Sequence, residues 1–266
     1  LPNTGSWTHQ YGSPSNSSNS GETLSGVTST DQLDVQWIGR PGADFGIDRN
    51  PRMPAPLAAN GRLFHQGLNR IAAIDAYNGA ILWSLEIPHL RRVNMPRDAS
   101  NWCADEDFIY VAIRDRCWRL SASDGELQQA YALPKKVDRE SYDWGYIAQE
   151  DSLVFGSAVK TGSVYTEFFG GESWYDQTSG YGTGKICSDI LFACDKESGQ
   201  PVWDYQNGVT INTTLAMGEG KLFFVESRHP ALKELKTSRI ESPELWLDQF
   251  LVALDAKTGQ KLWEKS

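Results

Sequence analysis

The amino-acid sequence predicts an all-β fold, a β-propeller of four-stranded antiparallel blades, and three observations lead to this prediction. First, Asp, Gly and Trp recur at a fixed spacing in "DAYNGAILW", "DKESGQPVW" and "DAKTGQKLW". Second, a degenerate copy, "SASDGELQQ", has Ser121 and Gln129 in place of the Asp and the Trp. Third, a strand, turn and strand pattern precedes each copy. Four strands in each of four repeating units are typical of a β-propeller.

Each copy of the motif has the pattern of a hairpin. The segments "IAAI", "CWRL", "LFAC" and "LVAL" are short and apolar, which is typical of a buried strand. The Asp that follows is expected to accept hydrogen bonds from the main-chain amides of the turn. The glycine that ends the turn is expected to have a positive φ angle, because it has no Cβ to clash. These glycines are Gly79, Gly125, Gly199 and Gly259.

A further hairpin precedes each of these, in "PLAANGRLFHQG", "WCADEDFIYVAI", "YIAQEDSLVFGSA" and "LAMGEGKLFFVES". The sequence therefore predicts blades at about 53–88, 98–134, 144–206 and 213–266, within a propeller portion that covers 33–266. The alternative is an all-β sandwich whose turns are similar by chance. We favour the propeller, because the repeat keeps its register over at least eight positions.

The pattern A-x-D-x-x-x-G-x-x-x-W resembles the tryptophan-docking repeat of quinoprotein-like (PQQ-like) β-propellers, and the opening "SWTHQYG" resembles the start of many such chains. In that family the indole packs between neighbouring blades and ties the ring together. The resemblance assigns this role to Trp37, Trp83, Trp203 and Trp263, and we expect the last three to be buried between blades. In the second blade, Gln129 departs from the pattern, so a weaker contact is expected there.

The predicted ring does not close within this sequence. "LDVQWIG" has the pattern of an outer strand without the rest of its blade, whereas "QKLWEKS" is the outer strand of the fourth blade. Rings of the quinoprotein-like family usually have seven or eight blades. Because proteins seldom tolerate exposed sheet edges, we expect a companion polypeptide, or a remaining part of the same protein, to supply the missing strands. Residues 1–32 are rich in Ser, Asn, Gly and Thr and predict an extended surface arm.

Charge and composition argue against several functions. The net charge of −9 disfavours non-specific binding to nucleic acid and to anionic membranes. No apolar run approaches the roughly 20 residues of a membrane-spanning helix. The sequence begins at Leu1 without a Met, so we expect a processed chain that lies in the periplasm or otherwise outside the cytoplasm.

The cysteines and histidines indicate no metal site. The four cysteines form no C-x-x-C motif, and the four histidines form no H-x-H or H-x-x-x-H pair. In the register of the repeat, Cys117 occupies the place of Ile71, Leu191 and Leu251, and Cys194 is also at an apolar strand position. We therefore expect both thiols to be small core side chains.

The loops that enter the innermost strands lie on the face where propellers usually bind ligands. Two of them, "NPRMPAP" and "MPRDASN", match each other and place Arg52 and Arg97 at equivalent positions. Two guanidinium groups facing one funnel would clamp a carboxylate, sulfate or phosphate. The alternative is that each arginine ties its own loop to a nearby carbonyl or acid. Further candidates are Arg49, Asn94, Asp98, Asp143, Trp144 and Asn212.

A long insertion at about 160–185 is rich in aromatic residues and glycine. That composition suits stacking against a sugar, and it equally suits docking of the rest of the ring.

The resemblance implies two classes of function. Catalytic members of the family hold PQQ on a Trp floor beside a Ca²⁺ bound by acid and amide groups, with an Asp as base. Asp143, Trp144 and Asn212 are of these types, but no motif assigns them these roles. The sequence predicts an extracytoplasmic binding or scaffold module whose loop face holds a partner or an anionic or sugar ligand. The alternative is a PQQ-dependent alcohol or sugar dehydrogenase, or a part of one.

Overall fold

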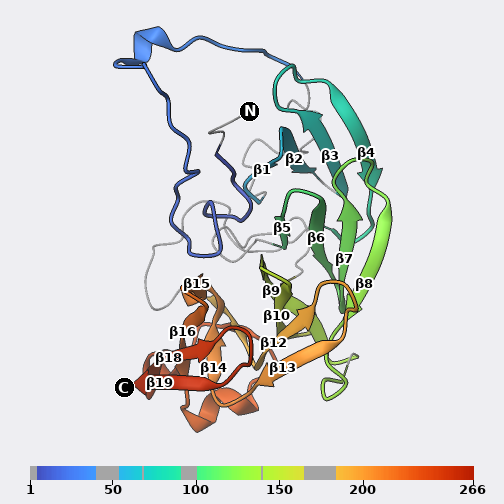
Figure 1. Cartoon of the computed structure of the whole chain (residues 1–266). Helices are drawn as coiled ribbons and strands as arrows, with labels where there is room; N and C mark the ends of the chain where they lie inside the picture. Colours follow the sequence, from blue (N-terminus) through green and yellow to red (C-terminus); the bar gives the residue numbers. More distant parts are fainter. Residues whose placement is uncertain (1–4, 40–53, 68, 91–100, 139, 165–183) are drawn as a thin grey trace.

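The sheets of the molecule lie side by side in an open arc. The computed structural model describes residues 5–39, 54–67, 69–90, 101–138, 140–164 and 184–266 (Figure 1). Within these residues the regular structure is β-strand and short 3-10 helix, and no helix has the length and apolar character to cross a membrane. Four sheets follow each other along the chain, and the first and the fourth lie at opposite ends of the arc.

The first three sheets each have four antiparallel strands. The first contains β1 (Leu57–Ala59), β2 (Arg62–Gly67), β3 (Arg70–Asp75) and β4 (Ile81–Glu86). The second contains β5 (Trp102–Ala104), β6 (Phe108–Ile113), β7 (Arg116–Ser121) and β8 (Leu127–Ala132). The third contains β9 (Tyr142–Glu150), β10 (Leu153–Lys160), β12 (Ile190–Asp195) and β13 (Pro201–Tyr205). In each sheet the strands are ordered as along the chain, from the innermost to the outer strand.

The fourth sheet has a broken innermost strand. β14 (Val209–Ile211) and β15 (Ala216–Gly218) both pair with β16 (Lys221–Ser227), and the 3-10 helix η2 (Asn212–Thr214) separates them. β18 (Gln249–Asp255) and β19 (Lys261–Lys265) follow as the third and outer strands.

Two short strands extend this sheet beyond β14. β11 (Lys185–Ser188) pairs with β14, although it lies between β10 and β12 in the chain, and β17 (Arg239–Ile240) pairs with β11. The connection from β16 to β18 also holds η3 (Pro230–Glu234) and η4 (Pro243–Trp246). The third and fourth sheets are therefore joined by a strand as well as by packing.

Apolar side chains fill the spaces between successive sheets. Phe64 and Trp102 are buried between the first and second sheets, and Tyr131 and Phe192 between the second and third. Phe224 belongs to the cluster between the third and fourth sheets. Each of these clusters joins neighbouring sheets, as expected for blades of a propeller.

The cysteines belong to this interior. All four are free thiols and are buried. Cys117 and Cys194 lie in the cluster between the second and third sheets, which confirms their prediction as core residues.

The turns between the third and outer strands have the predicted geometry. Oδ1 of Asp75 accepts hydrogen bonds from the amides of Tyr77 and Asn78 at 2.8 and 3.1 Å. Asp195 and Asp255 bind the amides of their own turns in the same way. The glycines that end the turns have φ angles of 67–78°: Gly79, Gly125, Gly199 and Gly259.

Each outer strand contains a β-bulge directly after its turn. In the first sheet, Ala73 is opposite Trp83 and Ile74 is opposite Ile81, so Leu82 has no partner on β3. The other sheets have the same shift, at Gln128, Val202 and Leu262. A bulge bends a strand and redirects the side chains that follow. Here the next residue is the one at the tryptophan position of the repeat.

Residues 5–39 lie outside the four sheets. Residues 7–16 run along the innermost strands on the concave side of the arc (Figure 1). Part of the segment that we expected on the surface is therefore packed against the sheets, and His9 is 5% exposed. Residues 33–39, which we expected to form an outer strand, pair with no strand in the part of the chain that the structure describes.

Candidate functional site

The turn of one sheet receives the indole of the sheet before it. Nε1 of Trp83, on β4, donates a hydrogen bond to the carbonyl of Ala122 in the second sheet at 3.0 Å. A Cβ at Gly125 would lie 2.8 Å from this indole, so only glycine fits beneath the ring. Trp203 makes the same bond to Ala256 at 2.9 Å.

Trp37 makes the same contact with the first sheet. Its Nε1 donates to the carbonyl of Ala76 at 3.0 Å, and a Cβ at Gly79 would lie 2.5 Å from its ring. Residues 33–39 therefore take the place of the outer strand of a preceding blade. Val35 and Ile38 of this segment are 67% and 92% exposed.

The contact between the second and third sheets uses other side chains. Nη1 of Arg119 and the hydroxyl of Tyr131 donate to the carbonyl of Lys196, at 2.6 and 2.7 Å. Arg119 also pairs with Glu197, at 3.0 Å. Gln129 replaces the tryptophan here, and Arg119 lies opposite it, where the other sheets have alanine. The arginine thus fulfils the role of the indole, a substitution that the repeat pattern alone did not reveal.

The last sheet exposes the face that every other sheet buries. Leu251, on β18, is 42% exposed, whereas its equivalents Ile71, Cys117 and Leu191 are at most 2% exposed. We call this face the open flank and define it by Leu251, Phe223 and Trp263. The ring centroids of Phe223 and Trp263 are 6.0 Å apart.

Trp263 was predicted to be buried, and this prediction is wrong. Its exposure is 39%, whereas that of Trp203 is 8%, because no further turn covers its indole in the described residues. The bulge residues Leu82, Val202 and Leu262 provide an internal comparison, since they are 46%, 47% and 46% exposed. The outer strands are thus equally exposed on their outer side at this position. Trp83, which was also predicted to be buried, is partly buried at its covered junction.

Three of the predicted ligand residues have structural contacts. Oδ2 of Asp143 accepts a hydrogen bond from the amide of Gly162 at 2.8 Å, and this carboxylate is nearly buried. Trp144 is fully buried, and its ring contacts Phe192 edge to face at a centroid distance of 4.8 Å. Both side chains stabilise the third sheet.

Asn212 belongs to a buried chain of hydroxyl groups between the third and fourth sheets. Its Oδ1 accepts from the hydroxyl of Ser188 at 2.6 Å, and Ser188 Oγ lies 2.7 Å from Ser157 Oγ. Ser157 Oγ in turn accepts from the amide of Tyr146 at 2.7 Å. These contacts fix η2 and β11 against β9 and β10.

The remaining ligand candidates lie outside the described residues: Arg49, Arg52, Asn94, Arg97 and Asp98. Most of the aromatic insertion, at 165–183, lies outside them as well. The predicted anion clamp therefore stays a prediction.

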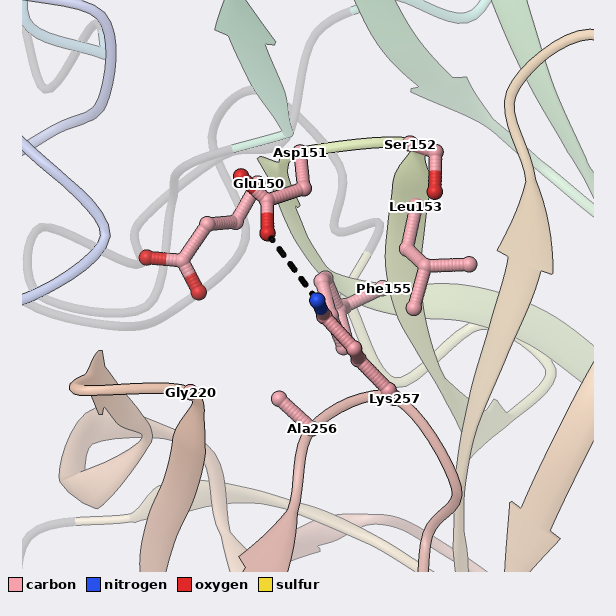
Figure 2. A pocket seen from close by; sticks show the side chains of 8 residues that line it. All are labelled: Glu150, Asp151, Ser152, Leu153, Phe155, Gly220, Ala256 and Lys257. Atoms are coloured by element: carbon pink, nitrogen blue, oxygen red, sulfur yellow. Dashed lines mark ion pairs between the residues drawn. The ribbon is translucent and has the colours of Figure 1, made fainter.

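Figure 2 shows a small cavity between the turns of the third and fourth sheets, lined among others by Glu150, Asp151 and Lys257. Its volume is about 20 Å³, which is room for about one water molecule. Lys257 Nζ lies 3.9 Å from Asp151 Oδ2, and both side chains are more than 70% exposed. Burial, and then the charge of Asp151, raise the pKa of Glu150. The cavity is a seam between two sheets and is too small for an organic ligand.

Asp143, Trp144 and Asn212 do not fit PQQ and its metal ion. The ring of Trp144 is enclosed in the core and offers no face on which a cofactor would lie. The oxygens named above of Asp143 and Asn212 bind groups of the protein itself. Within the described part of the chain, no group of three or more His, Cys, Asp and Glu side chains is arranged to hold a metal ion.

The comparisons with known proteins concern the fold. No protein-family model matches the sequence, and no curated protein matches it. The quinohemoprotein alcohol dehydrogenase of Comamonas testosteroni is 15% identical and has a TM-score of 0.50 over 80% of this chain and 34% of its own. The propeller prediction is thus supported by a solved structure. The chain has the fold of an open β-propeller.

Two other solved structures are similar to a lesser degree. The quinohemoprotein alcohol dehydrogenase ADHIIG of Pseudomonas putida HK5 gives a TM-score of 0.49 at 15% identity, over 79% of this chain and 33% of its own. BamB of Moraxella catarrhalis gives 0.40 at 15% identity, over 80% and 58%. The chain thus spans about a third of the length of these dehydrogenases.

Proposed function

We propose that this chain is a binding or scaffold module, located outside the cytoplasm, that forms part of a larger β-propeller or complex. The observation that carries the proposal is the open flank. Leu251 and Trp263 are 42% and 39% exposed there. The residues equivalent to Leu251 in the other sheets are at most 2% exposed, and Trp203, which is equivalent to Trp263, is 8% exposed. Exposed apolar patches on soluble proteins commonly mark interaction sites.

The occupant we propose for the open flank is a further blade of the same repeat type. At the junctions where a tryptophan is present, its indole donates to a carbonyl of the following turn and covers a glycine with positive φ. Trp263 is the same donor at the same position of β19, so the matching acceptor is a turn of the D-x-x-x-G type. Such a blade would come from a companion polypeptide or from another part of the same protein.

The opposite end of the arc supports the same proposal. Trp37 fills the turn of the first sheet, but the segment that carries it has no paired strand among the described residues. Strands added by a partner would pair with the main chain of 33–38 by β-augmentation. They would also cover Val35 and Ile38, which are now exposed.

Light scattering at increasing protein concentration tests the open flank. We expect the mass of the wild-type chain to rise above that of a monomer, because the flank of an isolated chain will bury itself against another copy. Leu251→Glu places a charge on the flank and should keep the chain monomeric. Leu262→Glu is the matched control, since this bulge residue of β19 is exposed to the same degree as its equivalents Leu82 and Val202 in the inner sheets. A monodisperse wild-type monomer at all concentrations, with a cooperative melt, would contradict the proposal.

The ligand of the loop face is a separate part of this proposal. An anionic ligand held by Arg52 and Arg97 is proposed from the matching loops of the sequence alone, and a sugar ligand from the aromatic insertion at about 160–185. Calorimetric titration with sulfate, phosphate and simple sugars, in the wild type and in the Arg52→Ala/Arg97→Ala variant, tests it. The alternative function, a PQQ-dependent dehydrogenase, is not favoured by any contact of Asp143, Trp144 or Asn212.

A further inference from the structure

One short segment near the N-terminus bonds to the innermost strand of every sheet. The amide and carbonyl of Trp7 form a bridge with Ala58 of β1, with N–O distances of 2.7 and 2.8 Å. The carbonyl of Thr8 accepts from the amide of Ala104, at the end of β5, at 2.9 Å. Adjacent residues of the segment thus join the first and the second sheet.

The next residues of the segment reach the third and fourth sheets. Nε2 of His9 accepts from the amide of Gln149, on β9, at 3.1 Å. The carbonyl of Pro14 accepts from the amide of Met217, on β15, at 2.9 Å. Nδ2 of Asn16 donates to the carbonyl of Leu215 at 2.8 Å. Residues 7–16 therefore contact all four sheets from their inner side.

His9 is the most enclosed polar group of this segment. Because Nε2 accepts a hydrogen bond, the ring proton lies on Nδ1, which donates to Oγ1 of Thr8 at 2.8 Å. The partner residue Gln149 is itself anchored on both sides. Its Nε2 donates to the carbonyl of Ala104 at 2.9 Å, and its Oε1 accepts from Lys196 Nζ at 2.7 Å. The histidine thus lies at the junction of the second and third sheets.

We propose that residues 7–16 form an intramolecular clasp that holds the four sheets at a fixed curvature. The main core clusters link neighbouring sheets only. In a closed ring, closure itself fixes the angle between successive blades, whereas an open arc lacks this constraint. The clasp supplies a direct link from the first sheet to the fourth. It presents the two ends of the arc at a constant separation, and it does so whether or not further blades are bound.

Hydrogen exchange of the four amides that donate to the clasp, those of Ala58, Ala104, Gln149 and Met217, tests this proposal. His9→Ala removes the acceptor at the third sheet only. If the clasp acts as one unit, exchange should rise at all four amides, by about fivefold or more, which corresponds to the loss of one hydrogen bond of ordinary strength. Ser15→Ala is the control, since this exposed hydroxyl bonds only to Ser13 within the segment.

A second variant makes the same test from the other end and guards against a folding defect of the first. Asn16→Gly removes the bond to Leu215, and glycine adopts the φ of 56° found at this position without strain. It should also accelerate exchange at Ala58 and Ala104, and small-angle scattering should show a wider spread of molecular dimensions. Acceleration confined to the amide nearest each substitution, with unchanged scattering, would overturn the proposal.

Discussion

At the scale of single residues, Trp203 and Trp263 occupy the same position of the repeat and differ only in what covers them. Trp203 donates to Ala256 and is 8% exposed, whereas Trp263 is 39% exposed. The resemblance of the repeat to the tryptophan-docking motif implied the role of each indole. It could not predict the exposure of Trp263, because burial depends on a neighbouring sheet rather than on the residue's own strand.

This difference leads to a paired prediction. Trp203→Ala should lower the free energy of unfolding by about 3–5 kcal/mol, as for a large aromatic removed from a core. Trp263→Ala should lower it by only about 1–2 kcal/mol, because less apolar surface is lost from contact. Denaturant titrations of both variants measure the two values. Equal losses would show that the indole does not stabilise the junction between the sheets.

His9 gives a prediction for the dependence of stability on pH. Burial, and then the charge of Lys196, lower the pKa of His9 to about 3 in the folded chain. In the unfolded chain the ordinary pKa is about 6.5. The unfolded state therefore binds more protons below about pH 6.5, and the stabilisation that is complete above this pH is lost as the pH falls toward 3.

The expected slope is about 1.4 kcal/mol per pH unit at most, between about pH 6 and pH 4. His9→Gln removes this contribution and should flatten the curve of unfolding free energy against pH. His89→Gln, at an exposed position, should leave the slope as in the wild type. A wild-type slope that persists in His9→Gln would show that the histidine is not buried in its neutral form.

At the scale of elements, the hairpins could be predicted and the additions to the fourth sheet could not. The apolar segments and the Asp and Gly turns identify their strands, since both signals are local. β11 and β17 have four and two residues and pair with strands far away in the sequence. Neither strand is long enough to show an alternation of apolar and polar residues. The bulges at Leu82 and its equivalents also escaped prediction, because the extra residue of a bulge does not differ in type from its neighbours.

At the junction of the second and third sheets, the arginine contact is open to replacement by the tryptophan contact of the other junctions. Arg119→Ala should cost about 1–3 kcal/mol of unfolding free energy, because it removes charge-assisted hydrogen bonds to Lys196 and Glu197. The double variant Arg119→Ala/Gln129→Trp restores the pairing of alanine with tryptophan found in the other sheets. It should regain at least part of this loss in thermal or chemical denaturation.

Gln129→Trp alone is the control for this exchange. The carbonyl of Lys196, to which the indole would donate, already accepts from Arg119 and Tyr131, so this single variant should be no more stable than the wild type. If the double variant is less stable than Arg119→Ala, the two types of junction are not interchangeable.

At the scale of the whole molecule, the open arc was predicted from the count of strands, and the structure agrees with it. The candidate ligand site as a whole stays a prediction. Asp143, Trp144 and Asn212 have the residue types of a cofactor site, but they bind neighbouring groups of the protein. Residue type indicates what a side chain is able to bind, whereas the direction of the side chain decides what it binds. The path of residues 7–16 across the sheets could not be predicted from the sequence either, because most of its hydrogen bonds are made by the main chain and do not depend on residue type.

The buried thiols report whether the arc unfolds as one unit. Cys103 and Cys117 lie in the second sheet, Cys194 in the third, and Cys187 on β11, which extends the fourth. If the clasp couples the sheets, a thiol reagent should label all four at one rate, that of global unfolding. Mass spectrometry of partly labelled protein measures the four rates. Earlier labelling of Cys187 would show that the fourth sheet opens on its own.

The position of Trp37 has a consequence for polymerisation. Two ends that complement each other would allow copies of the chain to add head to tail, and such heterologous contacts grow into filaments unless they close. The open flank carries a free indole, but the turn at Gly79 that would receive it from another copy already holds Trp37. Addition therefore requires the displacement of a bound side chain and its hydrogen bond. Residues 33–39 therefore block head-to-tail addition. Copies that meet through their open flanks are expected to form dimers rather than fibres.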